Sequence, residues 1–367
     1  MIRVALSRLP VAILVALALL AHGVSAPPVA AHGDDLVVET IPVGDPLRPW
    51  FRKRVMIFGI EVVATSTVSD VKILHAAAVM AEYLDTDEDS VADQPAVVLA
   101  MQQRRATLVM FQDSNQLENS SFWDSEEVET RWVQDNQADE TNPVGAFDAS
   151  LEEVLHLIHT AGYAQVFPDL ATESGSALAL AMDAARGGYF ESVPNNYPPG
   201  AWFHYDDPTC EYDCQAAEYF YWGLTSLLGA QTDRCAEIAD EWEPCNAGLL
   251  FAADSTFYNL LIDPVYGLPM ALPDGDYHGT ATSVCGNGAL EFPEFCDDGA
   301  ANGGNSSCCE ADCRLTPSGP ASCDGNICTR DQCSGGVCST LDCRTDEACS
   351  ICGGQCTGTT ATCDCVF

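Results

Sequence analysis

The pattern of apolar positions in the first part of the chain predicts strands that alternate with helices. A continuous run of β-branched and apolar residues, V-M-I-F-G-I-E-V-V-A (55–64), is typical of one buried strand, and T-L-V-M-F (107–111) predicts a second. Between them the apolar spacing becomes helical from Ser69. Pro95 is expected in the first turn of another helix that ends near Arg104.

Helical periodicity dominates the residues that follow. Residues 112–145 are expected to form an acidic loop with one short helix near 126–132. Four longer helices are then expected, over residues 151–161, 174–186, 214–229 and 246–262. Strands first and helices later is the order of an α+β domain, which we place at residues 51–280.

Both ends of the chain lack this periodicity. Residues 1–26 have a basic start, a short apolar stretch and small residues, which is the pattern of a secretory signal peptide, and residues 27–50 resemble a linker. Residues 285–367 contain 15 of the 19 cysteines, so we predict a small disulfide-rich module with little regular structure. No apolar run is long enough to cross a bilayer, so the protein is predicted to be secreted, without a transmembrane segment.

The charge of the chain excludes two classes of partner. The formal net charge is −39, and Lys53 and Lys72 are the only lysines in the sequence. Such a charge repels nucleic acid and anionic membranes. It suits a protein that stays soluble in a saline medium or one that collects divalent cations, and of these the solubility role is the simpler interpretation.

The first of the four long helices places acids and histidines on one side. At 100° per residue, Glu152, His156 and His159 fall within one narrow arc. Ser150 followed by Glu153 fits a capping box, and a solvated polar face would account for the histidines. Alternatively, the E-E-x-x-H motif corresponds to the zinc-binding H-E-x-x-H with its first histidine replaced by glutamate, which is also a Zn²⁺ ligand.

A second segment supplies another carboxylate. C-E-Y-D-C-Q-A-A-E-Y-F-Y-W-G-L (210–224) places Glu218 in a helix among alanines and aromatic residues, with Tyr212 six residues before it. An acid near a helix N-terminus is also favoured by the helix dipole alone. Together with the E-E-x-x-H helix, this segment resembles gluzincin peptidases of the anthrax-lethal-factor-like kind, in which an Ala-x-Glu-aromatic-aromatic segment supplies the third metal ligand.

The resemblance implies a zincin-like metallopeptidase domain and a role for each matching residue. Glu153 becomes the general base, and Tyr212 the group that stabilises the oxyanion. The implied Zn²⁺ ligands are Glu152, His156 and Glu218, with His159 as a substitute ligand. Glu152 departs from the family pattern, because a histidine normally stands there.

An acidic loop follows the helix that starts near Ser69. In D-T-D-E-D-S-V-A-D the acids occupy positions 1, 3, 5 and 9, as oxygen ligands do in loops that wrap Ca²⁺. These acids are Asp85, Asp87, Asp89 and Asp93. Ser90 stands where an EF-hand has glycine, and Ala96 stands where it has a bidentate glutamate. The loop therefore predicts a shorter Ca²⁺ site, and the alternative is an acidic loop that only ends the helix.

The cysteines are expected to form disulfides, because the chain is predicted to be exported. C-G-N-G-A-L-E-F-P-E-F-C-D-D-G (285–299) resembles the cysteine-rich repeat of secreted bacterial proteins. Two local bridges are the simplest pairing of the four earlier cysteines, and crossed pairing is the alternative. These four are Cys210, Cys214, Cys235 and Cys245.

Two functions follow from these features. The first is an exported zinc-dependent hydrolase that acts on an extracellular protein or peptide. The second is a non-catalytic extracellular adhesion or surface protein, with a Ca²⁺ loop and a disulfide-rich module. The two are distinguished by whether the helices at 151–161 and 214–229 meet in a metal site.

Overall fold

The computed structural model describes residues 36–279 and short parts of the tail. The tail parts are Gly286, Asn302, Cys309, β6 (Thr329–Ser334), β7 (Val337–Cys343), β8 (Gln355–Thr357) and β9 (Asp364–Val366). The predicted signal peptide and most of the cysteine-rich module lie outside the described residues. In the tail, β6 pairs with β7 and β8 pairs with β9, both antiparallel, so this region has two short ladders where little regular structure was expected.

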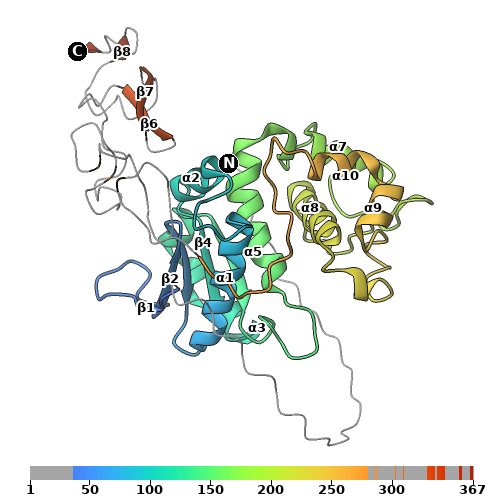
Figure 1. Ribbon diagram of the computed structural model, residues 1–367, viewed down its shortest axis with the longest axis horizontal. Coiled ribbons are helices and arrows are strands. Elements are labelled where there is room, and N and C mark those ends of the chain that lie inside the picture. Colours follow the sequence, from blue (N-terminus) through green and yellow to red (C-terminus); the bar gives the residue numbers. More distant parts are fainter. Residues whose placement is uncertain are drawn as a thin grey trace, which may run out of the picture.

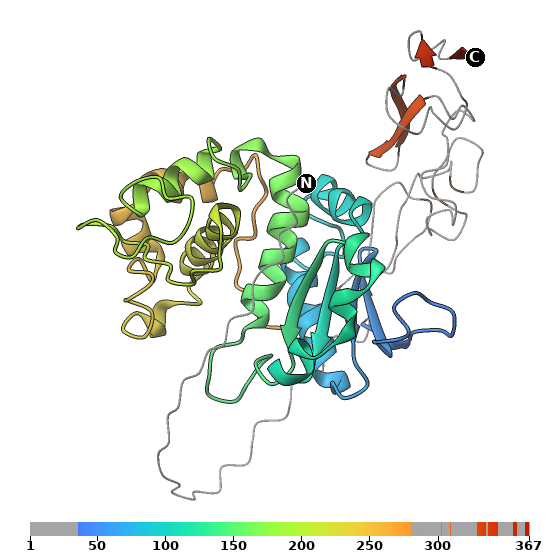
Figure 2. The ribbon, with the colours of Figure 1, turned by 180° about the vertical axis from the view of Figure 1, so that it is seen from behind.

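A five-stranded sheet forms the first half of the mixed α and β domain. Its strands are β1 (Glu39–Thr40), β2 (Lys53–Ile57), β3 (Ile60–Ala64), β4 (Thr107–Phe111) and β5 (Val133–Gln137). They lie in the order β1-β2-β3-β4-β5, and Figure 2 shows them in blue and teal. β1, β2 and β3 are antiparallel neighbours, whereas β3, β4 and β5 are parallel.

Two strand predictions differ from the structure. The apolar run at 55–64 is a hairpin and not one strand, because Phe58 and Gly59 have φ values of 46° and 76° and turn the chain between Ile57 and Ile60. Positive φ at both central residues is the geometry of a two-residue hairpin turn. The edge strand β5 was expected to be loop, because its sequence V-Q-D-N-Q is almost entirely polar.

Different elements pack against the two faces of the sheet. Residues such as Val62 and Leu108 pack against helices α1 (Asp70–Leu84), α2 (Pro95–Gln103) and α5 (Ser150–Ile158). On the other face, Val63 and Val109 pack against Ile41 and Leu47 and against the segment that holds three short helices. These are α3 (Ser114–Glu118), the 3₁₀ helix η1 (Ser121–Asp124) and α4 (Glu126–Glu129). The prediction of a linker is therefore wrong for residues 36–50, because Ile41 and Leu47 are fully buried.

The second half of the domain is helical. Figure 1 shows α5 between the sheet with α1 and α2 on one side and the remaining long helices on the other. After α5 come η2 (His159–Tyr163, a π-helical turn), α6 (Ala164–Val166), η3 (Pro168–Leu170), α7 (Ala177–Ala185), α8 (Tyr212–Leu228), η4 (Thr232–Arg234), α9 (Ala247–Ala253) and α10 (Ser255–Leu261). The helix expected over 246–262 is broken at Asp254, whose carboxylate caps α10 by accepting from the Phe257 amide. Among the described residues, no helix has the length and apolarity needed to cross a membrane.

Two disulfides fasten the loops on either side of α8. Cys210 bonds to Cys214, and Cys235 bonds to Cys245, which confirms the local pairing. The second bridge closes a loop that contains Trp242, and the indole of Trp242 donates to Ser226 Oγ at 2.9 Å. The loop that follows α8 is thereby fixed to the end of α8 itself.

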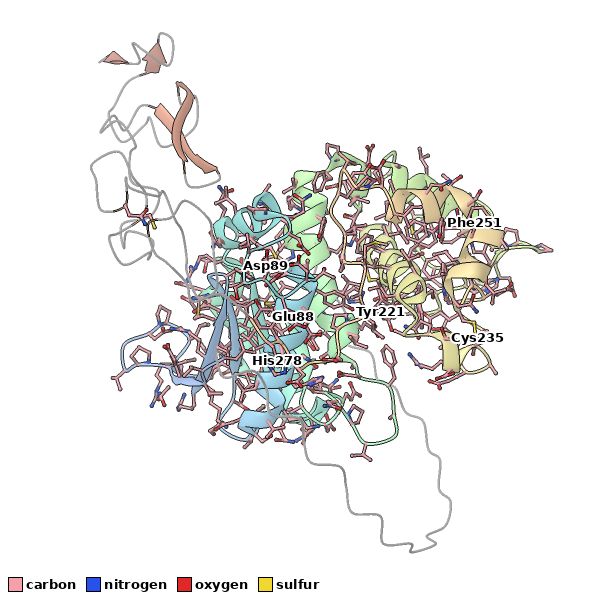
Figure 3. The ribbon with its side chains drawn as sticks, viewed as in Figure 1. Glu88, Asp89, Tyr221, Cys235, Phe251 and His278 are labelled. Atoms are coloured by element: carbon pink, nitrogen blue, oxygen red, sulfur yellow. A yellow bond between two sulfur atoms is a disulfide. The ribbon has the colours of Figure 1, made fainter. Side chains whose placement is uncertain are left out.

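A return segment, residues 264–279, brings the chain back to the sheet half. The Tyr163 hydroxyl donates to the Gly267 carbonyl oxygen at 2.9 Å, and Glu82 accepts from the backbone amides of Asp274 at 2.6 Å and Gly275 at 3.3 Å. The His278 amide donates to Glu88 at 2.8 Å, and Figure 3 shows these two residues close together. The return segment therefore depends on the acids of α1 and of the loop that follows it.

Gly275 is the tightest point of this contact. Its φ is +78°, and a Cβ atom placed there would lie 2.0 Å from the His75 ring. A side chain is excluded by both the backbone conformation and the available space.

Replacement of Glu82 by glutamine is expected to change how stability depends on pH. Burial raises the pKa of Glu82 from 4.5 to about 7. The folded chain therefore binds more protons than the unfolded chain between these values, so the free energy of unfolding falls as pH rises through this window. The contribution of Glu82 is on the order of 2–3 kcal/mol. Glu82→Gln still accepts from both amides but does not titrate.

Denaturant unfolding at pH 4.5, 6 and 7.5 in calcium-free buffer measures this effect. The loss of stability from the lowest to the highest pH should be smaller in Glu82→Gln than in the wild type. The exposed control Glu118→Gln should lose as much stability as the wild type. Other buried acids with raised pKa values, among them Asp85 at about 6 and Glu241 at about 8, supply pH dependence that remains in Glu82→Gln. If the free energy of unfolding falls by the same amount between pH 4.5 and 7.5 in the wild type and in Glu82→Gln, this account is wrong.

Candidate metal centre

Two helices bring three ligand-type side chains together. Glu152 and His156 lie one turn apart on α5, and Glu218 comes from α8. One ligand atom from each of the three lies within 4.8 Å of the other two. His156 Nε2 is 3.5 Å from Glu218 Oε2. The structure therefore brings together the three residues that the motif and the second helix segment predicted.

The burial of this group follows from the packing of α5. The apolar side of α5, including Val154 and Leu155, is buried in the core beneath the sheet. On the remaining side α5 contacts α8, so His156 is only 3% exposed and Glu218 only 5% exposed. A helix that is covered on two sides places its polar residues inside the protein instead of in solvent.

The start of α5 is held by Asp148 and not by a capping box. Asp148 Oδ1 accepts from the Ser150 amide at 3.1 Å and from the Ser150 hydroxyl, and Asp148 Oδ2 lies 2.5 Å from His75 Nε2 on α1. The N-cap residue is Ala149, and the Glu153 amide donates to the Ala149 carbonyl oxygen at 3.0 Å and not to the Ser150 hydroxyl. The capping-box interpretation of Glu153 is therefore wrong, and its carboxylate is left for another partner.

Glu153 lies beside the three-residue group. Its Oε2 atom accepts a hydrogen bond from the Gln134 amide on the edge strand β5 and is 3.9 Å from His156 Nδ1. The Gln134 side chain is buried, so it holds the Glu153 carboxylate in one orientation. Glu153 thus lies next to the three-residue group, on the Nδ1 side of the His156 ring.

The electrostatics of the group are dominated by burial and by repulsion between acids. Burial and the nearby carboxylates of Glu218 and Glu153 raise the pKa of Glu152 well above its ordinary value. Burial alone would lower the pKa of His156, but the charges of Glu218 and Glu152 and the hydrogen bonds to Glu153 and Glu218 together outweigh it and raise that pKa well above its usual range. Farther out, burial and Glu218 raise the pKa of Glu241 to about 8. The site is therefore a region of strong negative potential.

The donor set fits a divalent transition metal. His156 Nε2 is buried and makes no hydrogen bond within the described part of the chain. In residues 36–279, neither Glu152 nor Glu218 forms an ion pair with lysine or arginine. A buried imidazole nitrogen without a hydrogen bond, and two carboxylates without a lysine or arginine partner, are costly to enclose, and a metal ion would satisfy all three. One histidine and two carboxylates also leave the fourth position of a tetrahedral site open for water.

His159 does not join this group. Its ring stacks on Phe220 with centroids 4.0 Å apart, and its Nε2 donates to the Leu170 carbonyl oxygen at 2.9 Å. Burial lowers the pKa of His159 to about 3, so the ring is neutral. The helix widens into the π-helical turn η2 at this residue, so the regular spacing that placed His159 beside His156 ends there. The structure thus makes His159 a core residue and not a substitute ligand.

Tyr212 also lies away from the group. Its hydroxyl donates to Asp183 on α7 at 3.0 Å, and its ring packs under the Arg186 guanidinium at 5.1 Å. The residue that reaches Glu218 is Tyr205, from the aromatic loop before α8, whose hydroxyl donates to Glu218 Oε1 at 3.2 Å. Burial raises the pKa of Tyr205 far above its ordinary value, so it remains a proton donor. Nothing in the spacing of the sequence distinguishes Tyr205 from its aromatic neighbours.

Tyr221 is a second residue that sequence reasoning missed. Its hydroxyl makes a hydrogen bond to the Glu152 carboxylate, and its ring meets His156 edge to face with centroids 5.6 Å apart. Figure 3 labels it between α5 and α8. The sequence does contain a signal for Tyr221. It stands three residues after Glu218, and residues i and i+3 lie on the same face of a helix.

The acidic loop after α1 is a separate candidate site. One carboxylate oxygen from each of Asp85, Asp87 and Asp89 lies within 4.8 Å of the others. Ser90 has a φ of +70° and so adopts the turn that glycine usually provides. Asp85 already accepts from the Ser90 amide at 2.8 Å and from the Tyr277 hydroxyl. Asp93 is not in this group, and its Oδ2 accepts from the Thr86 amide at 2.9 Å.

No protein-family model, curated protein or solved structure matches this chain. The functional argument therefore rests on the geometry of the group formed by Glu152, His156 and Glu218, and on the residues that hold it.

Proposed function

We propose that the protein is an exported zinc-dependent hydrolase of the peptidase-like, gluzincin kind, with a variant E-E-x-x-H helix. The observation that carries the proposal is the convergence of Glu152, His156 and Glu218 around a buried His156 Nε2 that lacks a hydrogen bond in the described structure. An extracellular protein or peptide is the proposed substrate. The two body disulfides and the absence of a membrane-crossing helix among the described residues are compatible with export.

The distances suit zinc. With bonds of about 2.1 Å, the ligand atoms of a tetrahedral zinc site lie about 3.4 Å apart. The pair formed by His156 Nε2 and Glu218 Oε2, at 3.5 Å, already has this separation. The largest separation within the group is at most 4.8 Å, so a bound ion needs side-chain movements of about 1 Å.

Each part of the chain around the site has a defined task. When bound, zinc lowers the pKa of a coordinated water and polarises a substrate carbonyl. Glu153 Oε2 takes the proton of the attacking water and passes it to the leaving amine, and Gln134 keeps that carboxylate oriented. Tyr205 holds Glu218 through its Oε1 atom, so that Oε2 faces His156.

The second candidate function is a non-catalytic extracellular adhesion or surface protein that binds Ca²⁺. The clustering of Asp85, Asp87 and Asp89 favours it, since oxygen ligands in one short loop suit Ca²⁺. In this alternative the helices α5 and α8 keep the fold without a transition metal. The Ca²⁺ loop is compatible with both functions, because its three acids share no residue with the group on α5 and α8.

Metal analysis of two histidine variants tests the zinc site. His156 and His159 are both buried on consecutive turns, but only His156 belongs to the group. After exposure to Zn²⁺ and removal of excess metal, we expect about one zinc per chain in the wild type and in His159→Gln, and almost none in His156→Gln. Zinc retained by His156→Gln, or none in the wild type, would contradict the proposal.

Replacement of the general base separates chemistry from metal binding. Glu153→Gln keeps the hydrogen bond from Gln134 in an altered form and removes no ligand, so its zinc content should match the wild type. Hydrolysis of an unfolded protein substrate should fall by about 10²–10⁴-fold, because proton transfer is lost. The exposed control Glu126→Gln should keep both zinc and activity. Full activity in Glu153→Gln would exclude Glu153 as the base.

The acidic loop is expected to bind Ca²⁺ with a dissociation constant of about 10⁻⁴–10⁻³ M. Asp87 and Asp89 are exposed, so Asp87→Asn with Asp89→Asn removes ligand charge without disturbing the contact of Asp85 with Tyr277. The rise in melting temperature on adding millimolar Ca²⁺ should disappear in this double variant. It should persist in Asp93→Asn, because Asp93 lies outside the group. An unchanged Ca²⁺ response in the double variant would place the ion elsewhere.

A further inference from the structure

A chain of polar side chains leads from Glu152 to the loop after α8. The Tyr221 hydroxyl makes a hydrogen bond to Glu152, and the Gln231 amide nitrogen donates to the same hydroxyl at 3.2 Å. The Arg234 guanidinium then donates to Gln231 Oε1 at 3.0 Å. The chain runs Glu152–Tyr221–Gln231–Arg234 and joins a proposed ligand to a cation near the surface.

The orientation of Gln231 fixes the direction of every hydrogen bond in this chain. Because Arg234 can only donate, Gln231 Oε1 faces it and the amide nitrogen faces Tyr221. That nitrogen also donates to Thr225 Oγ1 at 3.0 Å, and Gln231 is fully buried. The Tyr221 oxygen therefore accepts from Gln231, and its own proton is directed to the Glu152 carboxylate. The Glu152 carboxylate therefore accepts from Tyr221, and a carboxylate has further lone pairs for a metal ion.

Arg234 connects the elements that carry the ligands. Its guanidinium lies 3.9 Å from the centroid of Phe147, which immediately precedes Asp148, the residue that accepts from the Ser150 amide at the start of α5. It also pairs with Glu237 at 2.8 Å. The next residue is Cys235, whose disulfide with Cys245 fixes this loop, and Figure 3 labels Cys235 at the edge of the helical half. Arg234 thus contacts both the segment before α5 and the loop after α8.

The chain of hydrogen bonds ends at Glu152, the glutamate that stands at the first ligand position of the motif. Glu152 adds a negative charge where H-E-x-x-H has a neutral histidine, and an additional charge among buried acids is costly. We infer that Gln231 and Arg234 are positioning residues that act through Tyr221 to hold Glu152 as a metal ligand. The inference rests on the proposed zinc site and adds to it the support that lets a glutamate replace the first histidine.

Zinc affinity, measured on the full chain by competition with a chromophoric chelator, tests this role. Tyr221→Phe and Gln231→Leu should each weaken Zn²⁺ binding by about 10–100-fold, which is typical when a hydrogen bond to a ligand is lost. Tyr219→Phe is the matched control. It removes a buried tyrosine hydroxyl from the same helix, one that donates to Asp254 instead of toward the site, and it should leave Zn²⁺ affinity within about threefold of the wild type.

A double variant shows whether Gln231 acts through Tyr221. Tyr221→Phe with Gln231→Leu should bind Zn²⁺ no more weakly than Tyr221→Phe alone, because the chain is already broken. Fully additive losses would overturn the inference, as would unchanged affinity in both single variants. If Gln231→Leu does not fold, Arg234→Gln replaces it, since the Arg234 side chain is 21% exposed.

The result for Arg234→Gln is equally decisive. A weakening of about 3–10-fold supports the inference, and unchanged affinity overturns it. A wild-type chain that binds no zinc would overturn the proposed function and this inference together. Stoichiometric zinc in the wild type, with all variants unaffected, would overturn the inference alone.

Discussion

The structure around this site depends on the meeting of Glu152, His156 and Glu218 between two helices, where His156 and Glu218 are buried. Ionisable groups that leave water must be paired, and the described chain offers these three no lysine or arginine. The elements around them are organised to hold this arrangement. α5 is fixed at its start by Asp148 and His75, and the apolar side of the helix is buried against the sheet half. α8 lies across α5 and is itself covered by α7, α9 and α10 (Figure 1).

The site lies where the sheet half and the helical half of the domain meet. The edge strand β5 contributes Gln134, which orients Glu153, and the aromatic loop before α8 contributes Tyr205, which orients Glu218. The return segment at residues 264–279 then joins the end of the helical half to α1. Both halves therefore supply side chains around the same three residues, and a change in their packing would move those residues directly.

Sequence periodicity was sufficient for features that depend on local spacing. It located α1, α2, β4, α5, α7 and α8, and the motif and the second helix segment correctly identified Glu152, His156 and Glu218 as neighbours. It failed where long-range contacts decide the outcome. β5 is polar yet pairs with β4, and the π-helical turn at His159 removes that residue from the arc assigned to it. Tyr205 and Gln231 reach the site from loops, which no helical or strand period can place.

Anomalous X-ray diffraction at the zinc edge, from crystals grown with stoichiometric Zn²⁺, tests the central claim most directly. The account predicts one anomalous peak between α5 and α8, about 2.0–2.2 Å from His156 Nε2 and from one oxygen of each of Glu152 and Glu218. Glu153 should lie beside the peak without contacting it, and the Tyr221 hydroxyl should contact the other oxygen of Glu152. No peak at this position, with a protonated carboxyl group hydrogen-bonded to His156 Nε2 instead, would contradict the account.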